Sequence, residues 1–175
     1  MRIKLKFLGA SKSVTGSRFL LEAAGKRLLI DCGLHQERTL KERDWGPFPV
    51  PPHTIDAVLL THAHLDHIGY LPKLVRHGYK NRVIGTDATM DIARYMLLDA
   101  ANIQMIDAEN KKKRHEKTGS KGPHPEIPLY TTEDAMACFP LFSSIRYKEK
   151  FFIGPDISVT FHNAGHVLGA AMIEM

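Results

Sequence analysis

A short apolar run followed directly by four potential metal ligands is the feature that most constrains this chain. Residues 57–60 are continuously apolar, as expected for a strand buried on both faces. His62, His64, Asp66 and His67 then follow within six residues. On a regular helix these side chains would fan around the axis, and on a strand the last would point away from the others. We therefore expect a strand that ends near His62 and turns into a helix near His67.

The residue types in this motif predict a metal centre. Neutral imidazole and carboxylate are ligands that suit zinc and its hydrolytic relatives. Two neighbouring ions explain the spacing better than one, with His62 and His64 on the first and Asp66 and His67 on the second. Two ions about 3.5–4 Å apart lower the pKa of a bridging water and clamp a phosphoryl group. Asp66 is also a candidate catalytic residue, because it could accept a proton from that water.

Two residues elsewhere in the chain are candidates for the same site. His166 follows a predicted strand and lies between Gly165 and Gly169, and glycines allow the backbone to approach a site closely. We expect it to complete three imidazoles on the first ion, the alternative being a packed core histidine. Asp31 ends a predicted strand and is expected to accept from a ligand or orient the 62–67 loop, the alternative being a strand-end cap. The remaining histidines are expected at the surface or in packing: His35, His53, His77, His115, His124 and His162.

The rest of the chain alternates predicted strands and helices. Thr86 is expected to cap a long helix whose stripe from Met90 to Ile103 packs against a sheet. Thr131 and Asp134 have the spacing of a capping box. That helix is expected to bury Ala135, Met136 and Phe139, and prolines predict a long loop over 34–56. Apolar patterning predicts a strand at 3–7 with one buried face, a hairpin over 18–31, a short helix at 68–75, and strands at 82–85, 157–161 and 170–173.

Composition limits the class of protein. At 175 residues, with 43% hydrophobic and 25% charged residues, the chain is expected to be one soluble globular domain. No segment approaches the roughly 20 apolar residues of a membrane span, and the alternating N-terminus does not resemble a signal peptide. Cys32 and Cys138 match no zinc-knuckle or redox spacing, which favours a cytoplasmic location.

The charge balance favours polyanionic partners. The net charge is +5 and the isoelectric point is about 9.2. A basic block, with Lys117 and Lys121 beyond it, leads into a stretch rich in glycine and proline, so we expect a mobile loop. It is either solvated or in contact with an RNA backbone. The candidate nucleic-acid-binding residues in this block are Lys111, Lys112, Lys113 and Arg114.

Four segments carry a resemblance to a known family: residues 9–17, 29–33, 60–69 and 164–170. The chain resembles the N-terminal part of a metallo-β-lactamase-fold hydrolase, and within that superfamily the β-CASP nucleases, which process RNA and sometimes DNA. The His-x-His-x-Asp-His motif is specific to the superfamily. Val-Thr-Gly-Ser at 14–17 and Ala-Gly-His-Val-Leu-Gly-Ala at 164–170 narrow the resemblance to the nuclease branch.

This resemblance implies an α/β fold, the αββα sandwich, with zinc ions at its rim. It assigns His62, His64 and His166 to one zinc and Asp66 and His67 to the other, with Asp31 behind them. The family continues to a bridging Asp, a β-CASP insert domain and late histidines. Residues 1–175 are therefore expected to form mainly the N-terminal half of the sandwich, without the insert and the remaining sandwich.

Three functions follow as hypotheses. The first is a zinc-dependent phosphodiester hydrolase, a ribonuclease or exonuclease of the β-CASP type that uses water activated at a dinuclear site. RNA is its expected partner, and no membrane association is expected. Binding of single-stranded DNA and assembly into a homo-oligomer are left open as alternatives. The second is a metallo-hydrolase of a thioester or lactone, which the segments 14–17 and 165–169 argue against. The third is a non-catalytic metal-binding fragment.

Overall fold

Two β-sheets organise the computed structural model, which describes residues 2–37, 39–119 and 126–175. The larger sheet has six strands in sequence order, antiparallel from β1 to β3 and parallel from β3 to β6. The smaller sheet is an antiparallel β7-β8-β9 meander. The strands are β1 Lys4–Phe7, β2 Phe19–Ala23, β3 Lys26–Ile30, β4 Ala57–Leu59, β5 Arg82–Thr86, β6 Phe142–Ile145, β7 Lys150–Gly154, β8 Ile157–Asn163 and β9 Ala171–Glu174.

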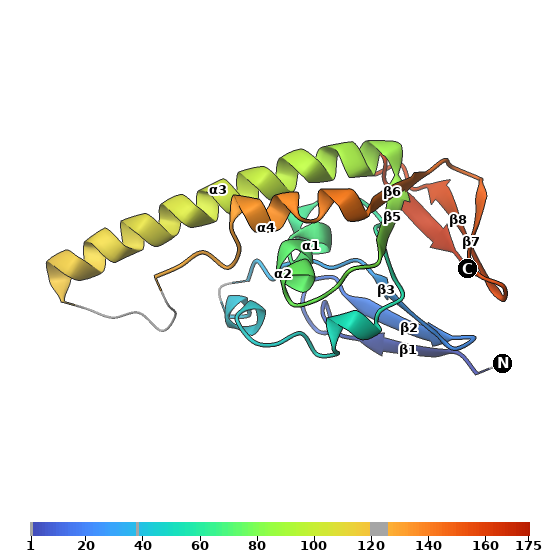
Figure 1. Cartoon of the computed structure of the whole chain (residues 1–175), viewed down its shortest axis with the longest axis horizontal. Helices are drawn as coiled ribbons and strands as arrows, with labels where there is room; N and C mark the ends of the chain where they lie inside the picture. The colour runs from blue at the N-terminus through green and yellow to red at the C-terminus, as the bar shows by residue number, and fades with distance from the viewer. Residues whose placement is uncertain (1, 38, 120–125) are drawn as a thin grey trace.

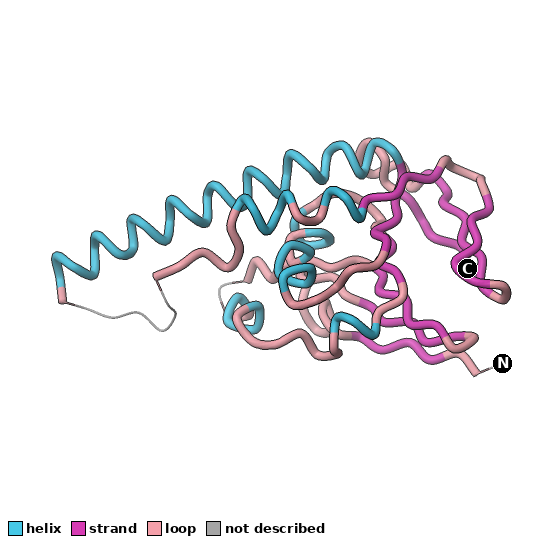
Figure 2. Tube along the Cα trace, in the orientation of Figure 1, coloured by secondary structure: helices cyan, strands magenta, loops and turns pink. Residues whose placement is uncertain are grey.

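The helices and the smaller sheet lie on opposite sides of the larger sheet, which gives three layers (Figures 1 and 2). The α-helices are α1 Leu65–Ile68, α2 Leu71–Arg76, α3 Asp87–Thr118 and α4 Thr132–Met136. Short 3-10 helices are η1 Lys41–Asp44, η2 Pro52–Thr54 and η3 Phe139–Leu141. No helix among the described residues is long and apolar enough to cross a membrane.

Apolar residues fill the space on both sides of the larger sheet. On β4, Val58 belongs to the cluster shared with the helices, whereas its neighbour Leu59 belongs to the cluster between the two sheets. Successive strand residues point to opposite faces, so a strand buried on both faces must be apolar throughout. This confirms the prediction from the run at 57–60. The predicted hairpin is also confirmed, as β2 and β3.

The first strand corrects a prediction. We expected one face of residues 3–7 to be buried, but Leu5 and Phe7 are 50% and 61% exposed. They lie opposite Leu21 and Phe19 of β2, and Phe7 makes an edge contact with the Phe19 ring at 5.4 Å. The buried residues between the sheets come from β2 to β6 and from β8 and β9, so the three-stranded sheet leaves β1 uncovered.

The long helix α3 begins as predicted, because the Thr86 side chain accepts a hydrogen bond from the backbone N–H of Thr89. Its apolar stripe buries Met90, Ala93 and Leu97 against the core. Ile103 is 52% exposed because, at about 100° per residue, it lies on another face of the helix from this stripe. The helix ends at Gly119, whose φ of 64° suits glycine.

The basic block is helical, which corrects the prediction of a mobile loop. Residues 111–117 continue α3, because Lys, Arg and Glu are good helix formers and no glycine intervenes before 119. Glu109 and Lys113 add an ion pair at 2.6 Å with i,i+4 spacing. Lys121, which we placed in that loop, and His124, which we expected at the surface or in packing, lie outside the described residues.

The short helix α4 carries the predicted capping box. The Thr131 hydroxyl accepts from the backbone N–H of Asp134, and the Asp134 carboxylate accepts from the backbone N–H of Thr131. Ala135 is buried and Phe139 packs partly against the core, as predicted. Met136 is 48% exposed, which corrects that prediction, because this helix of five residues buries only one side.

Candidate metal centre

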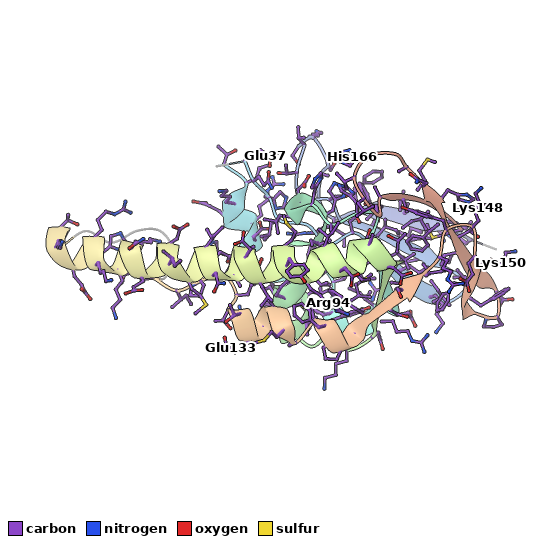
Figure 3. The ribbon with its side chains drawn as sticks, turned by 90° about the horizontal axis from the view of Figure 1, so that it is seen from above. Glu37, Arg94, Glu133, Lys148, Lys150 and His166 are labelled. Carbon is purple, nitrogen blue, oxygen red and sulfur yellow. The ribbon has the colours of Figure 1, made fainter. Side chains whose placement is uncertain are left out.

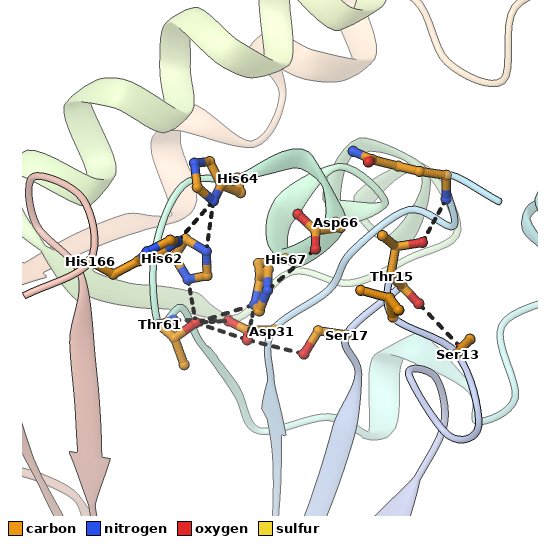
Figure 4. A network of polar contacts seen from close by, with 12 residues as sticks. Ser13, Thr15, Ser17, Asp31, Thr61, His62, His64, Asp66, His67 and His166 are labelled. Atoms are coloured by element: carbon orange, nitrogen blue, oxygen red, sulfur yellow. Dashed lines mark hydrogen bonds and ion pairs between the residues drawn. The ribbon is translucent and has the colours of Figure 1, made fainter. Parts of the chain in front are cut away.

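The ends of two parallel strands and two loops bring the predicted site residues together. Asp31 follows β3 directly, and His62 lies just beyond the end of β4. The turn into α1 carries His64, α1 itself carries Asp66 and His67, and the loop between β8 and β9 brings in His166. Figure 4 shows these side chains gathered at one place. Parallel strands end at the same edge of a sheet, so residues distant in sequence meet there.

Three imidazoles form the first group. His62 Nε2 lies 3.1 Å from His64 Nδ1, and His166 Nε2 lies 3.3 Å from the same nitrogen. One nitrogen from each ring lies within 4.8 Å of the other two. His62 is buried, His64 is partly exposed and His166 is exposed. Three convergent imidazole nitrogens form a donor set that could hold one divalent ion, with an open side toward solvent.

Asp66 and His67 form a second group beside the first. His67 Nε2 lies 3.5 Å from an Asp66 carboxylate oxygen. The rings of His62 and His67 are 4.0 Å apart between centroids, so the two groups adjoin. Imidazole with carboxylate suits a second divalent ion. The four residues of the motif and His166 are thus brought together by the fold, and their assignment to two ions stays a prediction.

Asp31 supports His67 from behind. It is buried, and its carboxylate accepts from His67 Nδ1 at 2.6 Å and from the backbone N–H of Thr61 at 2.8 Å. The hydroxyls of Thr61 and Ser17 also donate to it, at 2.9 and 3.3 Å. A donating Nδ1–H leaves His67 Nε2 with its lone pair free for a metal ion. The φ of Asp31 is 57°, a conformation that Asp tolerates better than most residues.

The protonation of two histidines reflects these surroundings. Burial, reinforced by the neighbouring imidazole of His67, lowers the pKa of His62 to about 4, so His62 is neutral at neutral pH. Burial also disfavours protonated His67, but the hydrogen bond and the charge of Asp31 outweigh it and raise the pKa of His67 above its ordinary value. Neutral imidazole is the form that binds metal.

A glutamate that the sequence did not single out holds the loop beside the site. The Glu37 carboxylate accepts from the backbone N–H groups of Val14 and Thr15 at 3.0 and 3.1 Å, and from the Thr15 hydroxyl. The hydroxyl contact, together with these amide contacts, lowers the pKa of Glu37 to about 2. Figure 3 shows Glu37 and His166 on the same side of α3, with Glu133 on the opposite side. No local pattern near residue 37 indicates this contact, because its partners lie more than twenty residues earlier.

The predicted nucleic-acid-binding residues are not part of this cluster. Lys111, Lys112, Lys113 and Arg114 lie in the distal half of α3, drawn in yellow in Figure 1. The last three of these are exposed. Their contact with RNA therefore remains a prediction that depends on a substrate reaching along α3.

Comparisons with known proteins agree with this geometry. The family described as Metallo-beta-lactamase superfamily domain matches residues 20–175. The chain belongs to the metallo-β-lactamase superfamily. Among solved structures of the superfamily, the Rm3 metallo-beta-lactamase has a TM-score of 0.51 and 21% identity, with 95% of this chain and 51% of that chain covered. The predicted α/β fold class is thereby confirmed, with this chain spanning about half of that structure.

Curated relatives connect the chain to the nuclease branch of the superfamily. Ribonuclease TTHA0252 of Thermus thermophilus is 36% identical over 94% of this chain and 33% of its own length. Transcription termination factor FttA of Methanosarcina mazei is 37% identical over 97% of this chain and 24% of its own. Cleavage and polyadenylation specificity factor 73 of Drosophila melanogaster is 34% identical over 97% of this chain and 22% of its own length. These relatives confirm the predicted resemblance to the β-CASP RNA-processing nucleases, and the chain spans between a fifth and a third of their length.

The superfamily implies a divalent metal ion, and the residues present fit one. Three imidazoles lie close enough to share an ion, and a histidine held by a buried carboxylate lies beside them with a second carboxylate. Imidazole held by a carboxylate is the usual arrangement of a metal-bound histidine.

Proposed function

We propose that this chain carries the N-terminal part of the active site of a zinc-dependent phosphodiester hydrolase that acts on RNA, of the β-CASP ribonuclease or exonuclease type. The observation that carries the proposal is the convergence of His62, His64 and His166 within 4.8 Å beside Asp66 and His67. Relatives named as a ribonuclease and as RNA-processing factors support RNA as the substrate. The net charge of +5 is compatible with a polyanion.

Each residue has a proposed role. His62, His64 and His166 would hold one zinc, and Asp66 and His67 the other. Two bound zinc ions would supply an activated water and neutralise charge on the phosphate. Asp66 would accept a proton from the attacking water as the phosphodiester is cleaved. Asp31 would keep the His67 Nδ1 proton in place, so that Nε2 stays available as a ligand.

The domain boundaries are part of the proposal. Residues 1–175 would be the N-terminal part of a metallo-β-lactamase domain, completed in a longer protein by the remaining sandwich and a β-CASP insert. The apolar side chains of β1 support this, because Leu5 and Phe7 are exposed on the face of the larger sheet that β2 to β6 bury against the smaller sheet. A monomer rarely leaves such a face in water. The coverage of the relatives supports it as well.

The test is cleavage of a 5′-labelled single-stranded RNA by the longer protein loaded with zinc, with His64→Ala and Asp66→Asn as variants. His53→Ala is the matched control, since His53 is a histidine outside the cluster. We expect RNA cleavage that both variants reduce by at least a hundredfold, roughly 2.7 kcal/mol of transition-state stabilisation, and that the control retains. Turnover of a thioester without RNA cleavage would favour the small-molecule hydrolase instead.

A further inference from the structure

A buried polar cluster lies behind the candidate site and takes no part in holding metal. Arg18, Asp44, His35 and Lys73 are each less than 5% exposed. They come from the residue just before β2, the loop after β3, η1 and α2, so they join four separate segments. Burying this many ionisable groups costs free energy unless each finds close partners. Their contacts therefore indicate what the cluster does.

Asp44 is the centre of this cluster. One of its carboxylate oxygens accepts from the Arg18 guanidinium at 2.5 Å and contacts His35 Nδ1 at 2.9 Å. The other accepts from the backbone N–H of His35 at 2.8 Å. The Lys73 ammonium donates to the backbone carbonyls of Asp44 and Gly46. The carboxylate thus fixes the chain at His35, two residues after the Asp31-Cys32-Gly33 segment.

Arg18 connects Asp44 to that segment. Its Nε donates to the carbonyl of Gly33 at 2.8 Å, while its Nη2 donates to the Asp44 carboxylate. The Arg18 guanidinium carbon also lies 4.1 Å from the centre of the Tyr70 ring, which restricts it from a further side. Residues 33 and 35 are therefore both held by the Arg18–Asp44 pair.

The segment so held lies directly against the helix that carries the proposed ligands. The backbone N–H groups of Cys32 and Leu34 donate to the carbonyls of His67 and Leu65, at 2.6 and 3.0 Å. A Cβ added to Gly33 would lie 1.6 Å from the Asp66 carbonyl oxygen, so the two backbones are in direct contact. The N–H of Ser17, next to Arg18, donates to the same Asp66 carbonyl at 2.8 Å.

We propose that the buried Arg18–Asp44 pair is a positioning device for the candidate metal centre, which fixes residues 32–34 and Ser17 against the backbone of Asp66 and His67. This proposal rests on the proposed function, in which Asp66 and His67 hold the second zinc ion. An ion pair with no positioning role could be replaced by apolar side chains at little cost. Here both partners also bind backbone that an apolar pair could not hold.

Native-state amide hydrogen exchange on the metal-free chain tests the proposal. Asp44→Asn removes the charge with little change of shape, and Arg18→Lys keeps the positive charge but loses the planar fork that joins Gly33 to Asp44. Val159→Ala is the control, because Val159 is fully buried between the sheets and far from these contacts in the fold. It lowers overall stability without touching the pair.

We expect the amides of Ser17, Cys32 and Leu34 to exchange at least tenfold faster in both variants than in the control, measured relative to the Leu60 amide, which donates to Ile84 of β5. Equal acceleration of all these amides would overturn the proposal, because it would assign the pair to general stability. If both variants fail to fold while Val159→Ala folds, the proposal is also overturned, because the pair would then be needed for folding in general. A zinc titration of the wild-type chain reports separately on the proposed function: no binding there refutes the metal centre and leaves the exchange result unaffected.

Discussion

Substitution of Asp31 by Asn is expected to disable His67 as a metal ligand while the chain stays folded. In the wild type, one carboxylate oxygen of Asp31 accepts from the backbone N–H of Thr61 at 2.8 Å and the other contacts His67 Nδ1 at 2.6 Å. Asn would keep its oxygen on the Thr61 N–H, which leaves its NH₂ group facing Nδ1. Because that group is a donor, Nδ1 must become the acceptor and the ring proton must move to Nε2. The nitrogen nearest Asp66 would then carry a proton.

The magnitude follows from the role of the carboxylate in orienting the imidazole. Removing a carboxylate that orients a metal-bound histidine lowers metal affinity about 10- to 100-fold, which is about 1.4–2.8 kcal/mol. Overall stability should fall by about 1 kcal/mol, because a charge-assisted hydrogen bond is exchanged for a neutral one. Asn tolerates the positive φ at this position at least as well as Asp does.

Long-range ¹H–¹⁵N spectra of the imidazoles provide the assay, since they report the tautomer of each histidine and its zinc occupancy during a titration. Asp56→Asn is the matched control, because Asp56 also accepts from a backbone N–H, that of Arg27, at 2.8 Å, but lies away from the site. We expect the His67 tautomer to switch and its zinc titration to weaken only in Asp31→Asn. An unchanged tautomer, or equal weakening in both variants, would refute this account of Asp31.

Three further predictions concern the scaffold. The pKa of Glu37 is lowered to about 2, so its contribution to stability is fully present above the unfolded value of 4.5 and is lost as the pH falls through 2. Glu37→Gln should therefore lower the unfolding midpoint at pH 7, and its difference from the wild type should shrink as the pH is lowered from 4.5 to 2. Gly33→Ala should lower the free energy of unfolding, measured by urea denaturation, by about 3 kcal/mol or more, because the added Cβ would collide with the Asp66 carbonyl oxygen. Gly46→Ala is the control and should change this free energy little, because the nearest atom to its added Cβ lies 3.5 Å away. Thr131→Ala should cost about 1 kcal/mol in the same assay through loss of the capping box of α4, and no measurable loss would contradict that reading.

Periodicity and turn chemistry were sufficient to predict most elements of this fold. The buried run at 57–60, the hairpin of β2 and β3, and the caps at Thr86 and Thr131 are all local signals, and each one is found in the structure. The errors arise where burial depends on distant chain. Leu5 and Phe7 alternate like a half-buried strand, yet what covers them is decided by the size of the other sheet.

The site shows the same division between local and distant information. The motif from His62 to His67 and the glycines around His166 identify its members, because metal ligands require particular residue types at particular spacings. The residues that support them have no such pattern. Glu37, Arg18 and Asp44 act through backbone groups that only the folded chain brings near. Charged residues that belong to no motif give no sign of such contacts in a single sequence.

Zinc binding by the purified chain tests the central claim most directly. Equilibrium dialysis followed by elemental analysis should find zinc bound to the wild type, and binding weakened at least tenfold, about 1.4 kcal/mol, in His62→Ala and in His166→Ala. His162→Ala should bind as the wild type does, since His162 pairs with Glu174 outside the cluster. Zinc binding that survives both cluster substitutions, or that is absent from the wild type, would contradict the assignment of these imidazoles as one metal centre.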